Sequence, residues 1–284
     1  MYVNNDIMPI YLGEKKVGKL YLGSTEIPAA YLGTGRVFMP AASKVYGFLG
    51  RLPSGLSSPN GMTYIGTDLY VAGARSDSLW KIDPDDPDKT TDGYGNLGRF
   101  SSQLTDAHGM AFDGTDLYVA DFRGRELWKI DPTNPDNVSG GYGLLGTFPD
   151  QLTQPLGMTY IGTDLYVAHA SGSQLWKIDP TNPDNVSGGY GLVGSFSSEL
   201  RNPRGLAHIG TDLYVVDFEQ DNLWKIDIDD LDKTTDGYGN KGRFPIGVDS
   251  ASAMTSDGID LYVADDSGDE LWRINPANPS QVTT

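Results

Sequence analysis

The chain is built on one phrase that recurs at a constant interval. Five copies of a phrase close to GTDLYVA are each followed by a variable stretch and by a close copy of LWKIDP. The interval is 48 residues, and it holds for tryptophans, aspartates and tyrosines alike: Trp80, Trp128, Trp176, Trp224 and Trp272; Asp68, Asp116, Asp164, Asp212 and Asp260; Tyr46, Tyr94, Tyr142, Tyr190 and Tyr238. A constant period of this length is typical of repeat architectures, in which neighbouring units bury a shared core.

Each period divides into four short β-prone segments. In the second copy these are residues 109–112, 116–120, 126–130 and 142–148, and the stretch before the last contains two prolines and two glycines. Proline and glycine in such numbers end a strand. Four short antiparallel strands in about 40–50 residues form the blade of a β-propeller. The sequence therefore predicts an all-β fold with five four-stranded blades.

The two ends of the chain predict how the ring closes. Residues 46–52 match the fourth segment of a period, whereas the last copy ends with only three segments of its own. Pairing the N-terminal segment with the last copy removes open strand edges. We therefore expect residues 45–284 to form one propeller, closed by an outer strand from its N-terminal side.

Strands in such blades are expected to be apolar on both faces. In the second copy, Leu117 and Val119 should face one neighbouring blade, and Tyr118 and Ala120 the other. The repeated tryptophans are expected in the core, because a ligand site rarely needs the same residue in every blade. We expect the aspartate of each GTD turn to cap its hairpin through the backbone.

Composition excludes several classes of function. The formal net charge is -17, which argues against binding the phosphates of nucleic acid and against adhesion to anionic lipid. The chain has no cysteine, so disulfides, thiolate metal sites and a cysteine nucleophile are impossible. The first ten residues lack the charged and apolar regions of a signal peptide, and no apolar run is long enough to span a membrane.

Residues 1–44 follow a second rule. A Tyr-Leu-Gly triplet recurs every ten residues, and a polar turn and a β-branched residue follow each triplet. This pattern predicts a small module of strands or hairpins. Three such units bury little core alone, so we expect a partner surface or further copies of the chain to complete it.

The segment IYLGEKKVGKLYLGSTEIPAAYLGTGRVF resembles the Tyr-Leu-Gly repeat near the N-terminus of many tailed-phage and prophage structural proteins. There the repeat precedes a variable C-terminal domain, which implies a virion attachment or oligomerisation module. The residues that would serve attachment here are Tyr11, Leu12, Gly13, Tyr21, Leu22, Gly23, Tyr31, Leu32 and Gly33. A generic β-hairpin leader is the alternative interpretation.

The phrase LYVAD…LWKID is similar to the repeats of NHL-like and streptogramin-lyase-like propellers, loosely over residues 46–284. Those relatives usually have more blades, and their catalytic histidine pattern has no match here. The resemblance supports the fold and leaves the activity open.

Two sets of loops differ between the five copies. One set precedes the inner strand of each blade, and the other joins its second and third strands; both should emerge on one face of the propeller. The candidate binding residues on this variable face are Asn60, Arg75, His108, Phe122, Arg123, Arg125, His169, Arg204, Phe218 and Glu219. Aromatic residues beside carboxylates, amides and arginines suit a glycan or a protein surface. A solvated face without a ligand is the alternative.

The opposite face is repetitive, because residues 131–144 are identical to residues 179–192. Acidic loops at residues 83–88 and 227–232 offer hard oxygen ligands for calcium. Their prolines, and the lack of the glycine and glutamate of an EF-hand, favour turn-forming aspartates instead. We therefore expect no cofactor.

Three histidines are too few to predict catalysis. His208 takes an inner-strand position held elsewhere by Tyr64 and Phe112, which indicates packing, and no carboxylates recur with His108 and His169.

The leading hypothesis is a phage virion protein, assembled in the host cytoplasm as a tail tip, tail fibre or head decoration. It would present a host-binding face in several copies per particle and contact other virion proteins through residues 1–44. The alternatives are a propeller lyase or hydrolase and a purely structural decoration protein.

Overall fold

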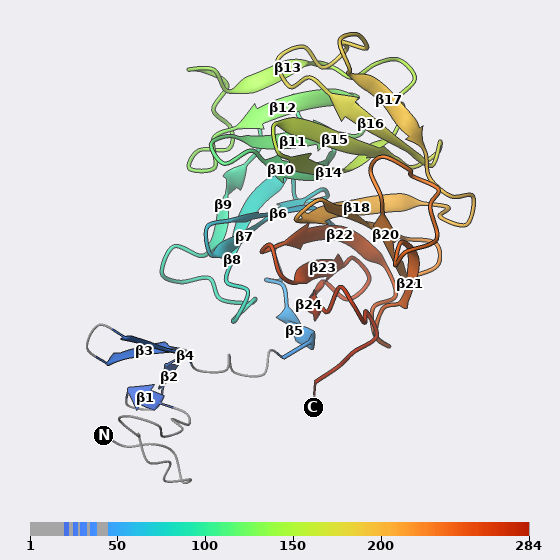
Figure 1. Cartoon of the computed structure of the whole chain (residues 1–284). Helices are drawn as coiled ribbons and strands as arrows, with labels where there is room; N and C mark the ends of the chain where they lie inside the picture. Colours follow the sequence, from blue (N-terminus) through green and yellow to red (C-terminus); the bar gives the residue numbers. More distant parts are fainter. Residues whose placement is uncertain (1–19, 23–24, 28, 33–34, 39–44, 284) are drawn as a thin grey trace. The chain divides into compact units, whose positions relative to one another are not determined.

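The structure is a computed structural model. It describes the backbone of residues 20–22, 25–27, 29–32 and 35–38, and the whole of residues 45–283. The chain divides into two compact units, of which the larger is Tyr46–Val282 (Figure 1). None of the described segments forms a helix with the length and apolar character that a membrane crossing requires.

The described strands before residue 45 form two antiparallel pairs. Strand β1 (Leu20–Leu22) pairs with β2 (Thr25–Ile27), and β3 (Ala29–Leu32) pairs with β4 (Gly35–Phe38). Each pair runs from a Tyr-Leu pair to the next β-branched residue, at Ile27 or Val37. Among the expected attachment residues, Tyr21, Leu22, Tyr31 and Leu32 lie in these strands, and the following lie outside the described residues: Tyr11, Leu12, Gly13, Gly23 and Gly33.

The larger unit contains five antiparallel sheets of four strands, as the period predicts. The first blade contains β6 (Pro59–Ile65), β7 (Asp68–Gly73), β8 (Ser78–Ile82) and β9 (Gly95–Arg99). The second contains β10 (Ala107–Phe112), β11 (Leu117–Asp121), β12 (Glu126–Ile130) and β13 (Gly143–Thr147). The third contains β14 (Pro155–Ile161), β15 (Asp164–His169), β16 (Gln174–Ile178) and β17 (Gly191–Ser195). The fourth contains β18 (Pro203–Ile209), β19 (Asp212–Asp217), β20 (Asn222–Ile226) and β21 (Gly239–Arg243).

The fifth blade takes its outer strand from the start of the propeller. Strands β22 (Ala251–Ser256), β23 (Leu261–Asp265) and β24 (Glu270–Ile274) are followed in the sheet by β5 (Gly47–Arg51), with Trp272 opposite Phe48. The inner strands β6, β10, β14, β18 and β22 lie beside one another in that order, and β22 lies beside β6. The ring is thus closed, and the predicted five-bladed propeller is confirmed.

The core lies between the blades rather than within them. Each of five buried clusters joins side chains of two neighbouring blades and contains one of the repeated tryptophans. Strand β11 shows why its apolar residues alternate: Leu117 and Val119 pack toward the first blade, whereas Tyr118 and Ala120 pack toward the third. The tryptophans are at most 6% exposed, so they belong to the core as expected.

The repeated Asp pairs with the repeated Lys in the first four blades, and it accepts a hydrogen bond from the repeated Tyr in the first, fourth and fifth blades. In the first blade the Asp68 carboxylate accepts a hydrogen bond from the Tyr94 hydroxyl at 2.8 Å and pairs with Lys81 at 2.9 Å. The expectation that Asp68 caps its own hairpin was wrong: the carboxylate contacts Lys81 of the third strand and Tyr94, which directly precedes the fourth strand. The fifth blade repeats the link across the closure, because the Tyr46 hydroxyl donates to Asp260 at 3.1 Å.

The inner strands approach so closely at the axis that glycine is required. Gly61, Gly109, Gly157 and Gly205 occupy the same position in four blades, and an added Cβ at Gly157 would overlap the backbone carbonyl oxygen of Arg204. At Gly205 the nearest atom to an added Cβ is 2.7 Å away, and the fifth blade has Ala253 there. The small residues therefore set the diameter of the ring.

We expect Gly157→Ala to lower the free energy of unfolding by about 1–3 kcal/mol, because the backbone of the fourth blade must move to admit a methyl group. Urea denaturation followed by tryptophan fluorescence measures the change. Gly205→Ala is the matched control and should cost less, since its nearest neighbour is farther away. Equal losses at both positions would contradict this account of the axis.

Candidate functional site

The axis of the propeller is closed in the middle and open at both ends. The residue that follows the glycine position in each inner strand also lines the axis, and the space left between these side chains is only about 10 Å³: Met62, Met110, Met158, Leu206 and Met254. Since all five inner strands start at the same end, their first residues line one mouth and their last residues line the other. Two separate pockets result.

The first pocket lies at the mouth formed by the loops that differ between blades. We call it the variable-face pocket; its volume is about 380 Å³, and it is lined by Ser58, Asn60, Ala74, Arg75, Asp77, Thr105, Asp106, Arg123, Arg204 and Asp266. These residues come from the first, second, fourth and fifth blades. Four of the ten residues expected to bind a ligand therefore meet here: Asn60, Arg75, Arg123 and Arg204.

A network of ion pairs forms one wall of this pocket. The Nε atom of Arg123 donates to Asp106 at 3.0 Å, and the Nε2 atom of His108 lies 3.2 Å from the same carboxylate. Burial raises the pKa of Asp106, but the hydrogen bonds and charges of His108 and Arg123 outweigh it, and the net pKa is lowered. The His108 ring lies 4.9 Å from that of Phe122 and within 3.4 Å of the Asn60 amide.

Two arginines in the pocket lack a counter-ion within 4 Å in the part of the chain that the structure describes. The Arg204 guanidinium stacks 3.3 Å above the Phe218 ring, and its buried Nε atom has no hydrogen-bond partner. Burial lowers the pKa of Arg204, and the nearby charge of Asp266 acts against this. Arg75 is exposed and makes no hydrogen bond or ion pair with any described residue, but its charge acts on the pKa of Asp269 and opposes the rise that burial causes there.

The remaining expected binding residues lie elsewhere. Arg125 contacts Asp150 on the surface, with its Nη2 atom 3.7 Å from the carboxylate. Glu219 pairs with Arg201 at 3.5 Å. Phe122 and Phe218 support His108 and Arg204 rather than line the pocket themselves.

His169 is turned into the protein. It is 6% exposed, and its ring nitrogens contact Thr153 at 3.1 Å, Ser171 at 2.9 Å and Gln174 at 3.1 Å. The corresponding position in three other blades holds a fully buried aspartate that accepts backbone N–H groups from both variable loops: Asp121, Asp217 and Asp265. His169 therefore anchors loops, as these aspartates do.

The first blade differs at this position, because Gly73 has no side chain to anchor its loop. The loop that follows, residues 74–77, carries Arg75 and Asp77 into the variable-face pocket. It is held by a backbone hydrogen bond from Ala74 to Ser58 at 2.9 Å and by the Ser76 hydroxyl, which donates to the Gly73 carbonyl at 3.2 Å. The blade without an anchoring side chain at this position thus contributes the most residues to the pocket.

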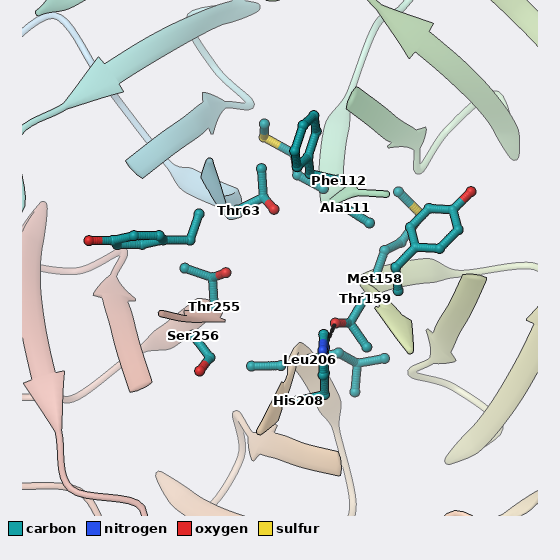
Figure 2. A pocket seen from close by; sticks show the side chains of 13 residues that line it. Thr63, Ala111, Phe112, Met158, Thr159, Leu206, His208, Thr255 and Ser256 are labelled. Atoms are coloured by element: carbon teal, nitrogen blue, oxygen red, sulfur yellow. Dashed lines mark hydrogen bonds between the residues drawn. The ribbon is translucent and has the colours of Figure 1, made fainter. Parts of the chain in front are cut away.

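The second pocket lies at the opposite mouth and has a volume of about 80 Å³. Figure 2 shows Thr63, Thr159, Thr255 and His208 directed into it from separate inner strands. The Nδ1 atom of His208 lies 3.1 Å from the Thr159 hydroxyl, and burial lowers the pKa of His208. Burial therefore favours the neutral form of the imidazole. His208 packs against the channel wall, where it also lines this small pocket.

Buried tyrosines beside this pocket predict alkaline unfolding. Burial raises the pKa of Tyr118 to about 12 and also raises that of Tyr160, whose ring centroid lies 5.4 Å away. An unfolded tyrosine ionises near pH 10. Because the folded pKa values are raised, the contribution to stability is complete below about pH 10 and is lost as the pH rises toward about 12.

Titration followed by tyrosinate absorbance and circular dichroism measures this loss. Tyr160→Phe, which introduces the residue that the second blade has as Phe112, should move the unfolding midpoint to higher pH. An unchanged midpoint would show that another group controls the transition.

The acidic loops considered for calcium form turns. The Asp83 carboxylate accepts the backbone N–H of Asp85 at 3.1 Å and pairs with Lys89 at 3.5 Å, and Asp227 does the same with Asp229 and Lys233. Among the described residues, no group of three or more acidic or histidine side chains has a metal-binding arrangement.

All three carboxylates in the variable-face pocket could have been singled out from the sequence. Asp106 and Asp77 lie in loops that differ between copies, next to residues that were selected, and Asp266 directly follows an anchor aspartate. The convergence of Arg204 from the fourth blade with Arg75 from the first had no sequence signal.

Solved structures with this fold include the glutaminyl cyclase of Myxococcus xanthus, with a TM-score of 0.56 and 13% identity over 79% of this chain and 92% of that one. A chain of the nidogen/laminin complex has a TM-score of 0.53 and 14% identity, over 82% of this chain and 89% of that one. The PQQ-bound aldose sugar dehydrogenase of Streptomyces coelicolor has a TM-score of 0.50 and 17% identity, over 86% of this chain and 85% of that one.

These neighbours are β-propeller proteins, and some are enzymes, so the fold itself permits catalysis. At such low identity the likeness shows the fold alone. No protein-family model and no curated protein sequence matches the chain. The chain is a five-bladed β-propeller protein whose candidate site is the variable-face pocket.

Proposed function

We propose that this chain is a virion structural protein of a tailed phage, whose propeller binds a glycan or a protein on the host surface through its variable face. The binding role rests on one observation: residues that differ between copies converge from several blades on one polar pocket. Residues 1–44, with their Tyr-Leu-Gly repeat, would attach the propeller to the particle.

The contrast between the two faces supports a binding role. On a rigid scaffold, ligand recognition is usually carried by loops that vary while the framework stays constant. Here the loops around the variable-face pocket differ at most positions, whereas residues 131–144 and 179–192 on the other face are identical. Several copies on one particle would convert weak single contacts into firm attachment.

Binding is favoured over catalysis by the state of the titratable groups. The Nε2 atom of His108 faces both Asp106 and Asn60, and these contacts hold the ring in the pocket wall. His169 is buried, and His208 lies at the opposite mouth with a threonine as its partner. The neighbouring enzymes therefore do not transfer an activity to this chain.

A loop exchange within the chain tests the binding role. Replacing residues 74–77 by the third-blade sequence Ala-Ser-Gly-Ser, together with Arg204→Leu, gives the variable face the residues of another blade. Fluorescently labelled full-length chain should bind host cells, and this variant should lose most of that binding. The control exchanges the opposite face, as Asp85→Thr with Asp86→Asn, and should bind normally. Equal binding by both variants would overturn the proposal.

The location of the protein is tested separately. Antibodies against the propeller should label purified phage particles in electron micrographs at the tail or on the head, and a chain without residues 1–44 should no longer be incorporated. Particles that lack the protein altogether would remove the virion role while leaving the binding role open.

A further inference from the structure

We propose that the ligand of the variable-face pocket is an acidic sugar, whose carboxylate is held by Arg75 and Arg204 and whose hydroxyls are held by the pocket's carboxylates. This inference rests on the proposed binding function and specifies its ligand. It depends on which charged groups in the pocket are already paired and which are free to meet a ligand.

Two arginines supply the positive charge for the ligand carboxylate. Arg123 is occupied by Asp106 at 3.0 Å, but Arg75 and Arg204 have no ion pair among the described residues. In a chain with a net charge of -17, two such guanidinium groups lining one pocket are unusual. Stacking on Phe218 fixes the plane of Arg204, so its outer nitrogens can meet a planar carboxylate with little further ordering.

The Nε atom of Arg204 adds a second indication. It is buried and has no hydrogen-bond partner, which is a costly state for a charged group. Asp266 lies near enough to affect the pKa of Arg204 but is not within ion-pair distance. A ligand carboxylate that meets the outer nitrogens would bring the missing negative charge to this guanidinium, whereas the buried Nε atom itself stays out of its reach.

The remaining lining indicates hydroxyl groups on the ligand. Asp77 and Asp266 accept hydrogen bonds only, Asn60, Ser58 and Thr105 can donate or accept, and Ala74 is apolar. A pocket with so few apolar side chains cannot bury a hydrophobic ligand favourably. Its volume of about 380 Å³ is at the lower end of the range for small-molecule sites and fits one or two sugar rings.

A glycan array that pairs each uronic-acid or sialic-acid glycan with its carboxyl-reduced form tests the inference. The full-length chain should prefer the acidic member of at least one pair by about tenfold or more, since paired charged hydrogen bonds have that effect. Calorimetry with tetragalacturonate and its methyl ester then measures the same preference in solution, and the affinity for the acid should fall as salt is added.

Variants with residues from other blades serve as matched controls. Arg75→Ser introduces the residue found at the equivalent position of the third and fifth blades, and Arg204→Leu introduces the residue found at the position equivalent to Arg204 in the third blade. The two substitutions together should abolish the preference for the acidic form. Arg75→Lys should keep part of it. Arg99→Ser, on an outer strand, introduces the third-blade residue Ser195 and should change nothing.

The outcomes separate this inference from the proposed function. Binding to host cells or to neutral glycans without any preference for acidic forms would overturn the acidic-sugar assignment and leave the binding function standing. If the chain bound a free amino acid such as glycine more tightly than every acidic glycan, the ligand would be a zwitterion, and the acidic-sugar assignment would be wrong. Loss of all cell and glycan binding in the parent chain would overturn both.

Discussion

A chain that begins at residue 53, and so lacks β5, is expected to unfold at a markedly lower temperature than the complete propeller. The deletion removes the outer strand of the fifth blade, including the pairing of Phe48 with Trp272, and the hydrogen bond from Tyr46 to Asp260. It also removes Leu52 from the cluster between the fifth and first blades. Several backbone hydrogen bonds and this burial together amount to roughly 5 kcal/mol.

A loss of that size corresponds to a fall in melting temperature of about 10–20 °C for a chain of this length. The exposed edge of β24 should also promote association between copies, because an unpaired strand edge is a template for another strand. Scanning calorimetry and light scattering measure both effects. A chain beginning at Val45 keeps β5 and is the control; equal losses in the two truncations would show that ring closure is not the cause.

Trp128→Ala is expected to lower the free energy of unfolding by about 3–5 kcal/mol. Trp128 is 1% exposed and packs with Phe100 and Leu104 of the preceding loop, so its removal leaves a cavity between two blades. Its Nε1 atom also donates to Glu126 at 3.1 Å. Because folded domains are stable by only about 5–15 kcal/mol, this single change should shift the urea midpoint strongly.

A comparison with Trp224 separates packing from hydrogen bonding. Trp224 is equally buried, but its Nε1 atom has no hydrogen-bond partner. Trp224→Phe should therefore cost less than Trp128→Phe, which leaves Glu126 without its donor. A larger loss at Trp224 would mean that the volume of the ring dominates and that the Glu126 contact contributes little.

Much of the fold could be predicted from periodicity. The 48-residue step, the four β-prone segments and the outer-strand sequence before residue 53 identified five blades and the closing strand, because each blade repeats the same local pattern. The role of the Asp in each GTD turn was predicted wrongly. Its partners, such as Lys81 and Tyr94 for Asp68, lie on another strand or directly before one, and only the sheet brings them near.

The candidate site was predictable as a face but not as a set of residues. His169 was selected because it differs from its copies, yet it replaces an anchoring aspartate and points inward. The equivalent positions in three other blades already indicated a structural role, because they hold Asp121, Asp217 and Asp265. Where most repeats hold the same polar residue at the end of a strand, the position is more often structural than a ligand contact. A different residue in one repeat then replaces the structural residue.

The sequence by itself determined the number of blades, the two apolar faces of each strand and the closure of the ring, because these follow from patterns that lie within a single repeat or at the chain's ends. The tertiary structure decided which variable side chains share a pocket. Arg75 and Arg204 are 129 positions apart in sequence, and only the curvature of the ring, set by close packing at Gly157 and its equivalents, brings them to one mouth. Distances across a ring depend on every blade in it, so no local pattern encodes them.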